Sequence, residues 1–243
     1  MSFTAKPYLK QAELRSDIER DVDSYPYNIP SVRAMGILEF HADVTFFVGE
    51  NGSGKSTVLE AIATALGYGS EGGTRNVQLK STESVSSLHQ ALRLGRSFGK
   101  PRDGYFLRAE SFFNVATYMD AIGGFSGPGD SSLHTCSHGE AFMALLTQKF
   151  RGKGLYLLDE PEAALSPTRQ LAALGAIHGL VRDHSQFIIA THSPILLSYS
   201  NAKILQFDGS GITEVQYEDT EHFAVTRDFL NNYPRRLEQL LGD

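Results

Sequence analysis

The sequence has little of what an extracellular or membrane-embedded protein needs. Among its 243 residues there is one cysteine, Cys136, so an internal disulfide is excluded and a reducing compartment is indicated. No run approaches the roughly 18 apolar residues that span a bilayer. The first twenty residues also lack the apolar stretch of a secretory signal. We therefore expect a cytoplasmic protein without direct membrane insertion.

Basic residues are also few. The 22 Lys and Arg residues against 28 Asp and Glu give a formal net charge of −6. This balance argues against nucleic-acid binding through bulk charge, although not against a local basic patch. Internal repeats and low-complexity tracts are missing too. With 41% hydrophobic residues the chain can bury a sizeable core, and we expect one domain over residues 1–243.

Short apolar runs alternate with helical patterns along the chain. Buried strands are expected at 44–48, 155–158 and 187–190, and helices at 55–66 and 168–182. This alternation predicts an α/β fold with a mainly parallel central sheet. The other expected elements are a strand at 32–40, a short helix at 86–94, a strand at 105–107, helical segments at 112–122 and 140–150, a hairpin at 203–207 and 212–217, and a helical tail at 221–243.

A glycine-rich loop lies between the first buried strand and the helix that follows it. It consists of Gly49, Glu50, Asn51, Gly52, Ser53, Gly54, Lys55, Ser56 and Thr57. The spacing matches the phosphate-binding P-loop, whose glycines let backbone N–H groups turn inward around a phosphate. The helix that follows adds its positive N-terminal end. Lys55 can reach the terminal phosphates and the Ser56 hydroxyl can ligate Mg²⁺, so the loop predicts a nucleotide site.

Two adjacent carboxylates, Asp159 and Glu160, end the buried strand 155–158. Ligands of open α/β sheets bind at the carboxyl ends of the strands, where the P-loop also lies. Asp159 is the candidate metal ligand. Glu160 is the candidate base that orients and deprotonates an attacking water. Two solvated acids are the alternative, but the P-loop upstream favours a hydrolytic site.

Two further polar segments are candidates for the same site. His192 follows the strand 187–190 and can sense or polarise a γ-phosphate, or else serve as a structural hydrogen-bonding group. Ser137 and Gly139 open the helical segment 140–150 and offer a hydroxyl and a backbone N–H to a second anion. The same segment, with Glu140, also matches a capping box. These two interpretations are compatible, because a capped helix still exposes backbone donors.

These segments occur in the order found in ABC-type ATPases. Gly49–Thr57, Ser137–Glu140, Leu155–Pro161, Ala164–Pro167 and His192 resemble the Walker A, signature, Walker B, D-loop and H-loop. The resemblance covers roughly residues 31–207 and is strongest to stand-alone AAA-family predicted ATPases of the SMC and RecF branch. It implies a P-loop NTPase fold with an ABC-type head, an N-terminal antiparallel β portion and a small helical lid, with residues 70–139 as inserted arm and signature subdomain. ATP and Mg²⁺ are the implied cofactors. A head-to-tail homodimer is implied as well, in which Ser137 of one copy faces the P-loop of the other.

The chain departs from the family pattern in three places. The signature is Ser137-His138-Gly139-Glu140 in place of Leu-Ser-Gly-Gly-Gln, and no glutamine stands at the Q-loop position. There the resemblance leaves Glu110 as the candidate facing the metal or water. The short spacing between Walker A and the signature excludes an SMC-type coiled-coil insertion. Adenine stacking is assigned to Tyr27 or its neighbour Tyr25, with a tyrosine packed beside a proline turn as the alternative.

Three functions remain open on the sequence. The first is an ATP-hydrolysing molecular switch that closes as a dimer. The second is the ATPase subunit of a membrane transporter, which the motif order allows but the missing Leu-Ser-Gly-Gly-Gln and Q-loop glutamine oppose. The third is a role in nucleic-acid maintenance or defence, or with a partner protein. Its support is a set of basic residues, for which scattered solvated charges are the alternative interpretation: Arg75, Lys80, Arg93, Arg96, Lys100 and Arg102.

Overall fold

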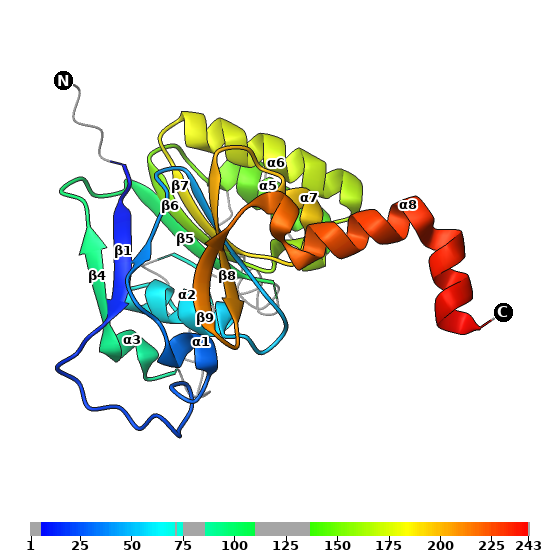
Figure 1. The fold of residues 1–243 in the computed structure, drawn as a ribbon. Helices are drawn as coiled ribbons and strands as arrows, with labels where there is room; N and C mark the ends of the chain where they lie inside the picture. The colour runs from blue at the N-terminus through cyan, green and yellow to red at the C-terminus, as the bar shows by residue number, and fades with distance from the viewer. Residues whose placement is uncertain (1–5, 71, 75–85, 110–136, 243) are drawn as a thin grey trace.

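Two β-sheets organise the chain, as the computed structural model in Figure 1 shows for residues 6–70, 72–74, 86–109 and 137–242. The central sheet has the strand order β5-β6-β7-β3-β8-β9. Its first five strands are parallel, whereas β9 pairs with β8 in the antiparallel sense. Its strands are β3 (Val44–Val48), β5 (Asp103–Arg108), β6 (Gly154–Asp159), β7 (Gln186–Ala190), β8 (Ala202–Asp208) and β9 (Gly211–Val215). The predicted α/β fold with a mainly parallel sheet is therefore confirmed.

The middle strands of this sheet are buried on both faces. Phe46 and Phe47 are neighbours in β3, yet they pack into two different hydrophobic clusters. Successive side chains of a strand point to opposite faces, so a strand covered on both sides must be apolar throughout. The continuous apolar runs in the sequence are explained by this double cover.

Helices cover the two faces (Figure 1). On one face lies α2 (Lys55–Ala65), which buries Val58, Leu59 and Ile62 together with Phe47. The other face is covered by α6 (Pro167–Arg182), α5 (His138–Ala144), a π-helical turn at Leu145–Lys149 and α7 (Pro194–Leu197). Parallel strands are joined by crossover connections, usually helices, which pack on the faces of the sheet and hold the strands in their order.

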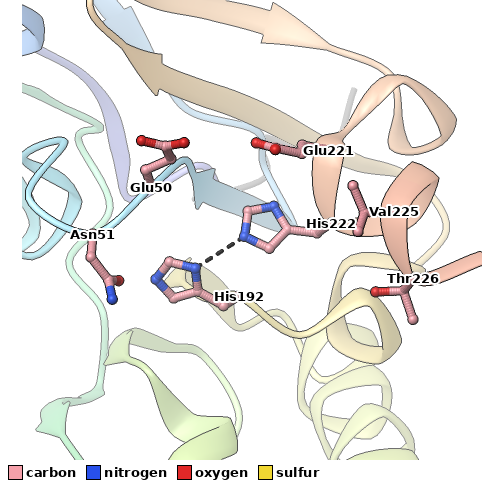
Figure 2. Close-up of a pocket in the computed structure, with 7 residues that line it drawn as sticks. All are labelled: Glu50, Asn51, His192, Glu221, His222, Val225 and Thr226. Carbon is pink, nitrogen blue, oxygen red and sulfur yellow. Dashed lines mark hydrogen bonds between the residues drawn. The ribbon is translucent and has the colours of Figure 1, made fainter. Parts of the chain in front are cut away.

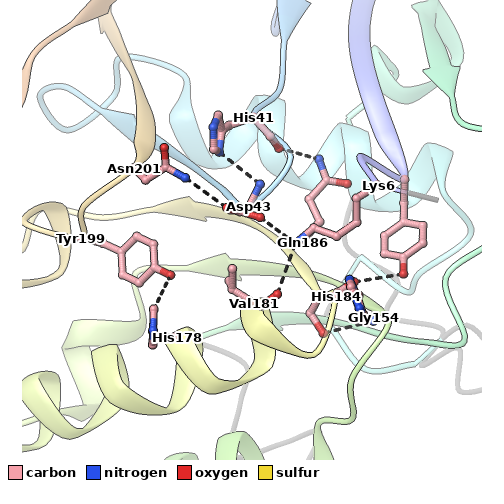
Figure 3. Close-up of polar contacts among 12 residues, drawn as sticks. Lys6, His41, Asp43, Gly154, His178, Val181, His184, Gln186, Tyr199 and Asn201 are labelled. Atoms are coloured by element: carbon pink, nitrogen blue, oxygen red, sulfur yellow. Dashed lines mark hydrogen bonds and ion pairs between the residues drawn. The ribbon is translucent and has the colours of Figure 1, made fainter. Parts of the chain in front are cut away.

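A three-stranded antiparallel sheet, ordered β2-β1-β4, lies beside α2. Its strands are β1 (Leu9–Leu14), β2 (Leu38–Glu39) and β4 (Leu92–Arg96), the last preceded by α3 (Leu88–Ala91). The fully buried Gln186 of β7 joins it to the central sheet, as Figure 3 shows in part. Its amide accepts from the Leu9 N–H at 3.0 Å and donates to the Leu9 carbonyl at 2.8 Å and the His41 carbonyl at 2.9 Å. The expected N-terminal antiparallel β portion is present.

Two sequence predictions are wrong in part. Residues 32–40 do not form one strand, because α1 (Pro30–Arg33) comes first and only Leu38–Glu39 pairs as β2. Pro30 at the first helical position fixes a backbone angle suited to a helical turn. The helix expected at 86–94 ends at Ala91, because pairing with β1 draws Leu92–Arg96 into a strand. The segment predicted at 112–122, like Glu110, lies outside the described residues.

The last helix, α8 (Glu221–Leu241), extends away from the sheets (Figure 1). It has no buried residue, and its helical geometry breaks at Asn232, two residues before Pro234. Proline removes a helical hydrogen bond and crowds the preceding turn, which accounts for the kink. None of the helices in the described part of the chain is long and apolar enough to cross a membrane.

Candidate functional site

The three predicted polar segments meet at one edge of the central sheet. The P-loop follows β3, Asp159 and Glu160 end β6, and His192 follows β7. Since β6, β7 and β3 are parallel neighbours, their carboxyl ends lie side by side. The parallel topology thus brings together residues more than 100 positions apart.

The P-loop needs its glycines for close approach. Gly49 has φ of 141°, and a Cβ there would lie 2.2 Å from the Phe207 carbonyl oxygen. Lys55 opens α2, is only 4% exposed and donates from Nζ to the Gly49 and Glu50 carbonyls, both at 2.8 Å. Burial lowers the pKa of Lys55, while Glu160 and Asp159 oppose that change. The ammonium group therefore lies within the loop, where a phosphate can compete for its donors.

A residue that the sequence did not indicate supports this loop. Ser31 in α1 is fully buried and donates from its hydroxyl to the Ser53 carbonyl. A Cβ at Gly54 would lie 2.8 Å from that hydroxyl oxygen. The Ser53 hydroxyl is buried and makes no hydrogen bond within the described chain. The α1 turn thus fixes the loop backbone and leaves one loop hydroxyl for a ligand.

The acid pair is divided between two roles by its geometry. Asp159 is 5% exposed and accepts from the Ser56 hydroxyl at 2.8 Å, and Nε of Arg108 lies 3.7 Å from its other oxygen. Glu160 takes a left-handed backbone conformation with φ 50° and ψ 50°. Such a conformation costs about 1–3 kcal/mol in a residue other than glycine and is concentrated at functional sites. The turn directs Glu160 differently from Asp159.

Ser56 and Asp159 fit a magnesium ion. Mg²⁺ prefers hard oxygen ligands and is held by one or two protein groups together with phosphate oxygens and water. The hydroxyl and carboxylate oxygens of these two residues already lie 2.8 Å apart. They are therefore the pair that can hold the metal, whereas the third candidate, Glu110, is not among the described residues.

His192 reaches the same edge. Its Nε2 lies 3.7 Å from Oε1 of Glu160 and makes no hydrogen bond in the described part of the chain. Burial lowers the pKa of His192, Lys55 lowers it further, and Glu160 opposes both effects. A neutral imidazole with one ring nitrogen turned toward the acid pair follows from this arrangement.

Glu162 links the segment that follows β6, which carries the acid pair, to the segment that follows β7, which carries His192. The sequence interpretation missed this role. It accepts from the Thr191 hydroxyl at 2.7 Å and from the His192 backbone N–H at 2.5 Å. Burial raises the pKa of Glu162, and these hydrogen bonds oppose the rise. The only signal in the sequence was a third acid after Asp159-Glu160-Pro161. Glu162 fixes the position of the His192 backbone relative to β6.

Comparisons with known proteins identify the fold. A family model described as an AAA domain matches residues 28–108. The structure of cbiO1 from Clostridium perfringens, part of the ABC transporter complex cbiONQ, superimposes with a TM-score of 0.51 at 16% identity, over 98% of this chain and 100% of that one. This chain has the fold of an ABC-type ATPase head.

The SMC head domain from Thermotoga maritima is also similar to this chain. Its TM-score is 0.45 at 16% identity, over 86% of this chain and 98% of that one. A comparison with proteins of curated function found no matching sequence. Identities this low show the fold alone.

Residues 137–140, which resemble a signature segment, form the capping box that the sequence indicated. The Ser137 hydroxyl accepts from the Glu140 N–H at 3.4 Å, and the Glu140 carboxylate accepts from the Ser137 N–H at 2.8 Å. Arg169 of α6 donates to both residues, at 3.2 and 3.1 Å. A Cβ at Gly139 would lie 2.7 Å from the Ala164 carbonyl oxygen, so only glycine allows this close approach to the D-loop.

The two candidate tyrosines have different surroundings. Tyr27 is partly buried and packs against the hydrophobic cluster of α2. Tyr25 is 62% exposed, and its hydroxyl lies 3.4 Å from that of Thr57, the last residue of the P-loop. Tyr25 therefore has the open ring beside the loop, while adenine stacking by Tyr27 stays a prediction.

Proposed function

We propose that this ABC-type head binds and hydrolyses ATP as a molecular switch of the soluble, SMC-like class. The observation that carries the proposal is the convergence of Lys55, Asp159, Glu160 and His192 at one sheet edge. Two distances describe this convergence. The Ser56 hydroxyl lies 2.8 Å from a carboxylate oxygen of Asp159, and Nε2 of His192 lies 3.7 Å from a carboxylate oxygen of Glu160. This set supplies phosphate binding, metal ligation and a base for water in one place.

Each residue has a separate task in the proposed reaction. The loop N–H groups and Lys55 bind the β- and γ-phosphates. Ser56 and Asp159 hold Mg²⁺, which neutralises phosphate charge when it is bound. Glu160 orients a water and accepts its proton, while His192 donates a hydrogen bond to the γ-phosphate.

The proposed site is completed by a second copy of the chain. The Ser137 hydroxyl and the Gly139 N–H lie at the start of α5, where an anion is favoured by the helix end. Ser137 is exposed and is oriented by Arg169. In a head-to-tail homodimer this end of one copy meets the P-loop of the other, so that two ATP molecules are sandwiched. A cytoplasmic location is part of the same proposal.

Glu160→Gln tests hydrolysis and dimer closure together. The variant keeps the size and hydrogen-bonding capacity of the side chain but cannot accept the proton of water. We expect kcat to fall about 10²- to 10⁴-fold, the usual contribution of a general base. ATP and Mg²⁺ should then trap a dimer, detected by size-exclusion chromatography with light scattering.

The matched controls are the same variant without ATP and Lys55→Ala with ATP, both of which should stay monomeric. A monomer in all conditions would refute the dimer, and an unchanged kcat would refute Glu160 as the base. Co-purification with a multi-span membrane protein would instead support the transporter alternative.

A further inference from the structure

A second histidine lies at the carboxyl edge of the central sheet and comes from a part of the chain that carries no motif. His222 is the second residue of α8, and its Nε2 lies 3.0 Å from Nδ1 of His192. Both rings line a cavity of about 550 Å³. In Figure 2, Glu50 and Asn51 of the P-loop lie on one side of the two rings and the first turns of α8 on the other. His222 is thus in direct contact with His192.

The first turn of α8 is fixed in place, although most of the helix is exposed. Thr220 is fully buried; its hydroxyl caps the Phe223 N–H at 3.3 Å and donates to the Tyr217 carbonyl at 2.7 Å. The Tyr217 hydroxyl donates to the Pro194 carbonyl at 2.8 Å, two residues after His192. Hydrogen bonds close to both histidines, at Thr220 before His222 and at Pro194 after His192, therefore fix their relative position.

Two neutral imidazoles in contact must share one proton between the facing nitrogens. Burial lowers the pKa of both rings, and the nearby Lys55 ammonium lowers them further. Either Nδ1 of His192 donates or Nε2 of His222 donates. The carboxylate of Glu160, 3.7 Å from Nε2 of His192, favours donation by His222, because it attracts an N–H on Nε2 and repels a lone pair there.

We propose that His222 is a positioning residue that donates to Nδ1 of His192 and holds the His192 proton on Nε2. His192 then presents a donor on the side of the acid pair, where the proposed reaction places the γ-phosphate. The inference rests on the proposed function for its catalytic consequence, but the tautomer itself is a property of the chain without nucleotide. Groups that orient a functional histidine through its other nitrogen commonly change activity about 10- to 100-fold when removed.

Two variants separate donation from packing. His222→Phe keeps a ring in the cavity but removes the donor, and His222→Gln replaces it with an amide N–H. We expect Phe to lower kcat about 10- to 100-fold with little change in KM for ATP, and Gln to restore much of the loss. A merely structural role would affect the two variants alike and would not divide kcat from KM.

Nitrogen-15 NMR of the imidazoles gives a readout that needs no turnover. We expect His192 in the wild-type chain to carry its proton on Nε2, and His222→Phe to lower the population of this tautomer. Protonation of Nδ1 in the wild-type chain, or wild-type kcat in His222→Phe, would overturn the inference. If the wild-type chain does not hydrolyse ATP, the proposed function fails, and the NMR result still decides the tautomer.

Discussion

Polar groups are hydrogen-bonded differently at the carboxyl and the amino ends of the strands of the central sheet, which we call its carboxyl and amino edges. At the carboxyl edge, the Ser53 hydroxyl and Nε2 of His192 make no hydrogen bond among the described residues, and Glu160 has a strained backbone. At the amino edge, Lys6 pairs with Asp43 at 2.7 Å, Asn201 donates to the same carboxylate, and Gln186 uses both ends of its amide (Figure 3). Buried polar groups normally make hydrogen bonds, so buried groups without one indicate that the carboxyl edge is the ligand-binding edge.

The largest expected difference between the edges is seen with two lysines. Lys55→Ala should raise the Kd for ATP at least about 100-fold, because two charge-assisted hydrogen bonds to phosphate are worth about 3 kcal/mol. Lys6→Ala is the matched control at the amino edge and should leave the Kd unchanged. Isothermal titration calorimetry measures both variants. Nucleotide binding retained by Lys55→Ala would remove the basis for the P-loop assignment.

Gln186 tests the amino edge as a structural device. Gln186→Ala removes three hydrogen bonds and leaves the Leu9 N–H and carbonyl buried without that partner. We expect the free energy of unfolding to fall by about 2 kcal/mol, as measured by urea denaturation. The Kd for ATP should not change at temperatures where the variant is folded. Loss of nucleotide binding with little loss of stability would contradict the division between the edges.

The parts of the fold and site that local sequence determines were predictable. The strand Val44–Val48, the glycine loop and the helix from Lys55 follow one another without interruption, and the periodicity and glycine spacing are enough to identify them. Asp159-Glu160 could be placed for the same reason, since a buried strand leads directly into them. Their shared edge follows from parallel topology alone.

Contacts between distant segments could not be predicted. Gln186 and Leu9 are 177 residues apart, and His192 and His222 are 30 apart, with no periodic pattern connecting either pair. The strand β1 was missed because a register shift between Leu9 and Gln11 breaks its alternation. Such contacts depend on tertiary packing, which overrides local propensity.

The histidine pair predicts a pH dependence of stability at the carboxyl edge. The pKa of both histidines is lowered in the folded chain, for His222 mainly by burial, His192 and Lys55, with Glu221 and Glu162 opposing. As the pH falls below about 6.5, the unfolded chain binds protons first. The stability present above that pH is then lost as the pH falls through the lowered values.

Urea denaturation across this pH range measures the effect. His222→Phe should show a shallower loss of stability than the wild-type chain, because it removes one ring whose pKa is lowered in the folded chain. The matched control is His178→Phe. His178 contacts Tyr199 at the amino edge, so this variant also loses a histidine but keeps both His192 and His222. A wild-type slope in His222→Phe would contradict the coupling of the two rings.

The smallest expected effect tests the basic patch through Arg93, while Arg75 and Lys80 of the same set lie outside the described residues. Arg93 of β4 is 66% exposed at its side chain and pairs with Glu13 at 2.8 Å, while Arg96 donates to the Ala65 carbonyl. An exposed pair of this kind contributes about 0.5 kcal/mol or less, so Arg93→Ala should barely change the free energy of unfolding. Because Glu13 already compensates Arg93, the variant should also leave ATPase activity in the presence of DNA unchanged. A marked loss of DNA-stimulated ATPase, with a steep salt dependence in the wild-type chain, would show instead that this patch contacts nucleic-acid phosphates.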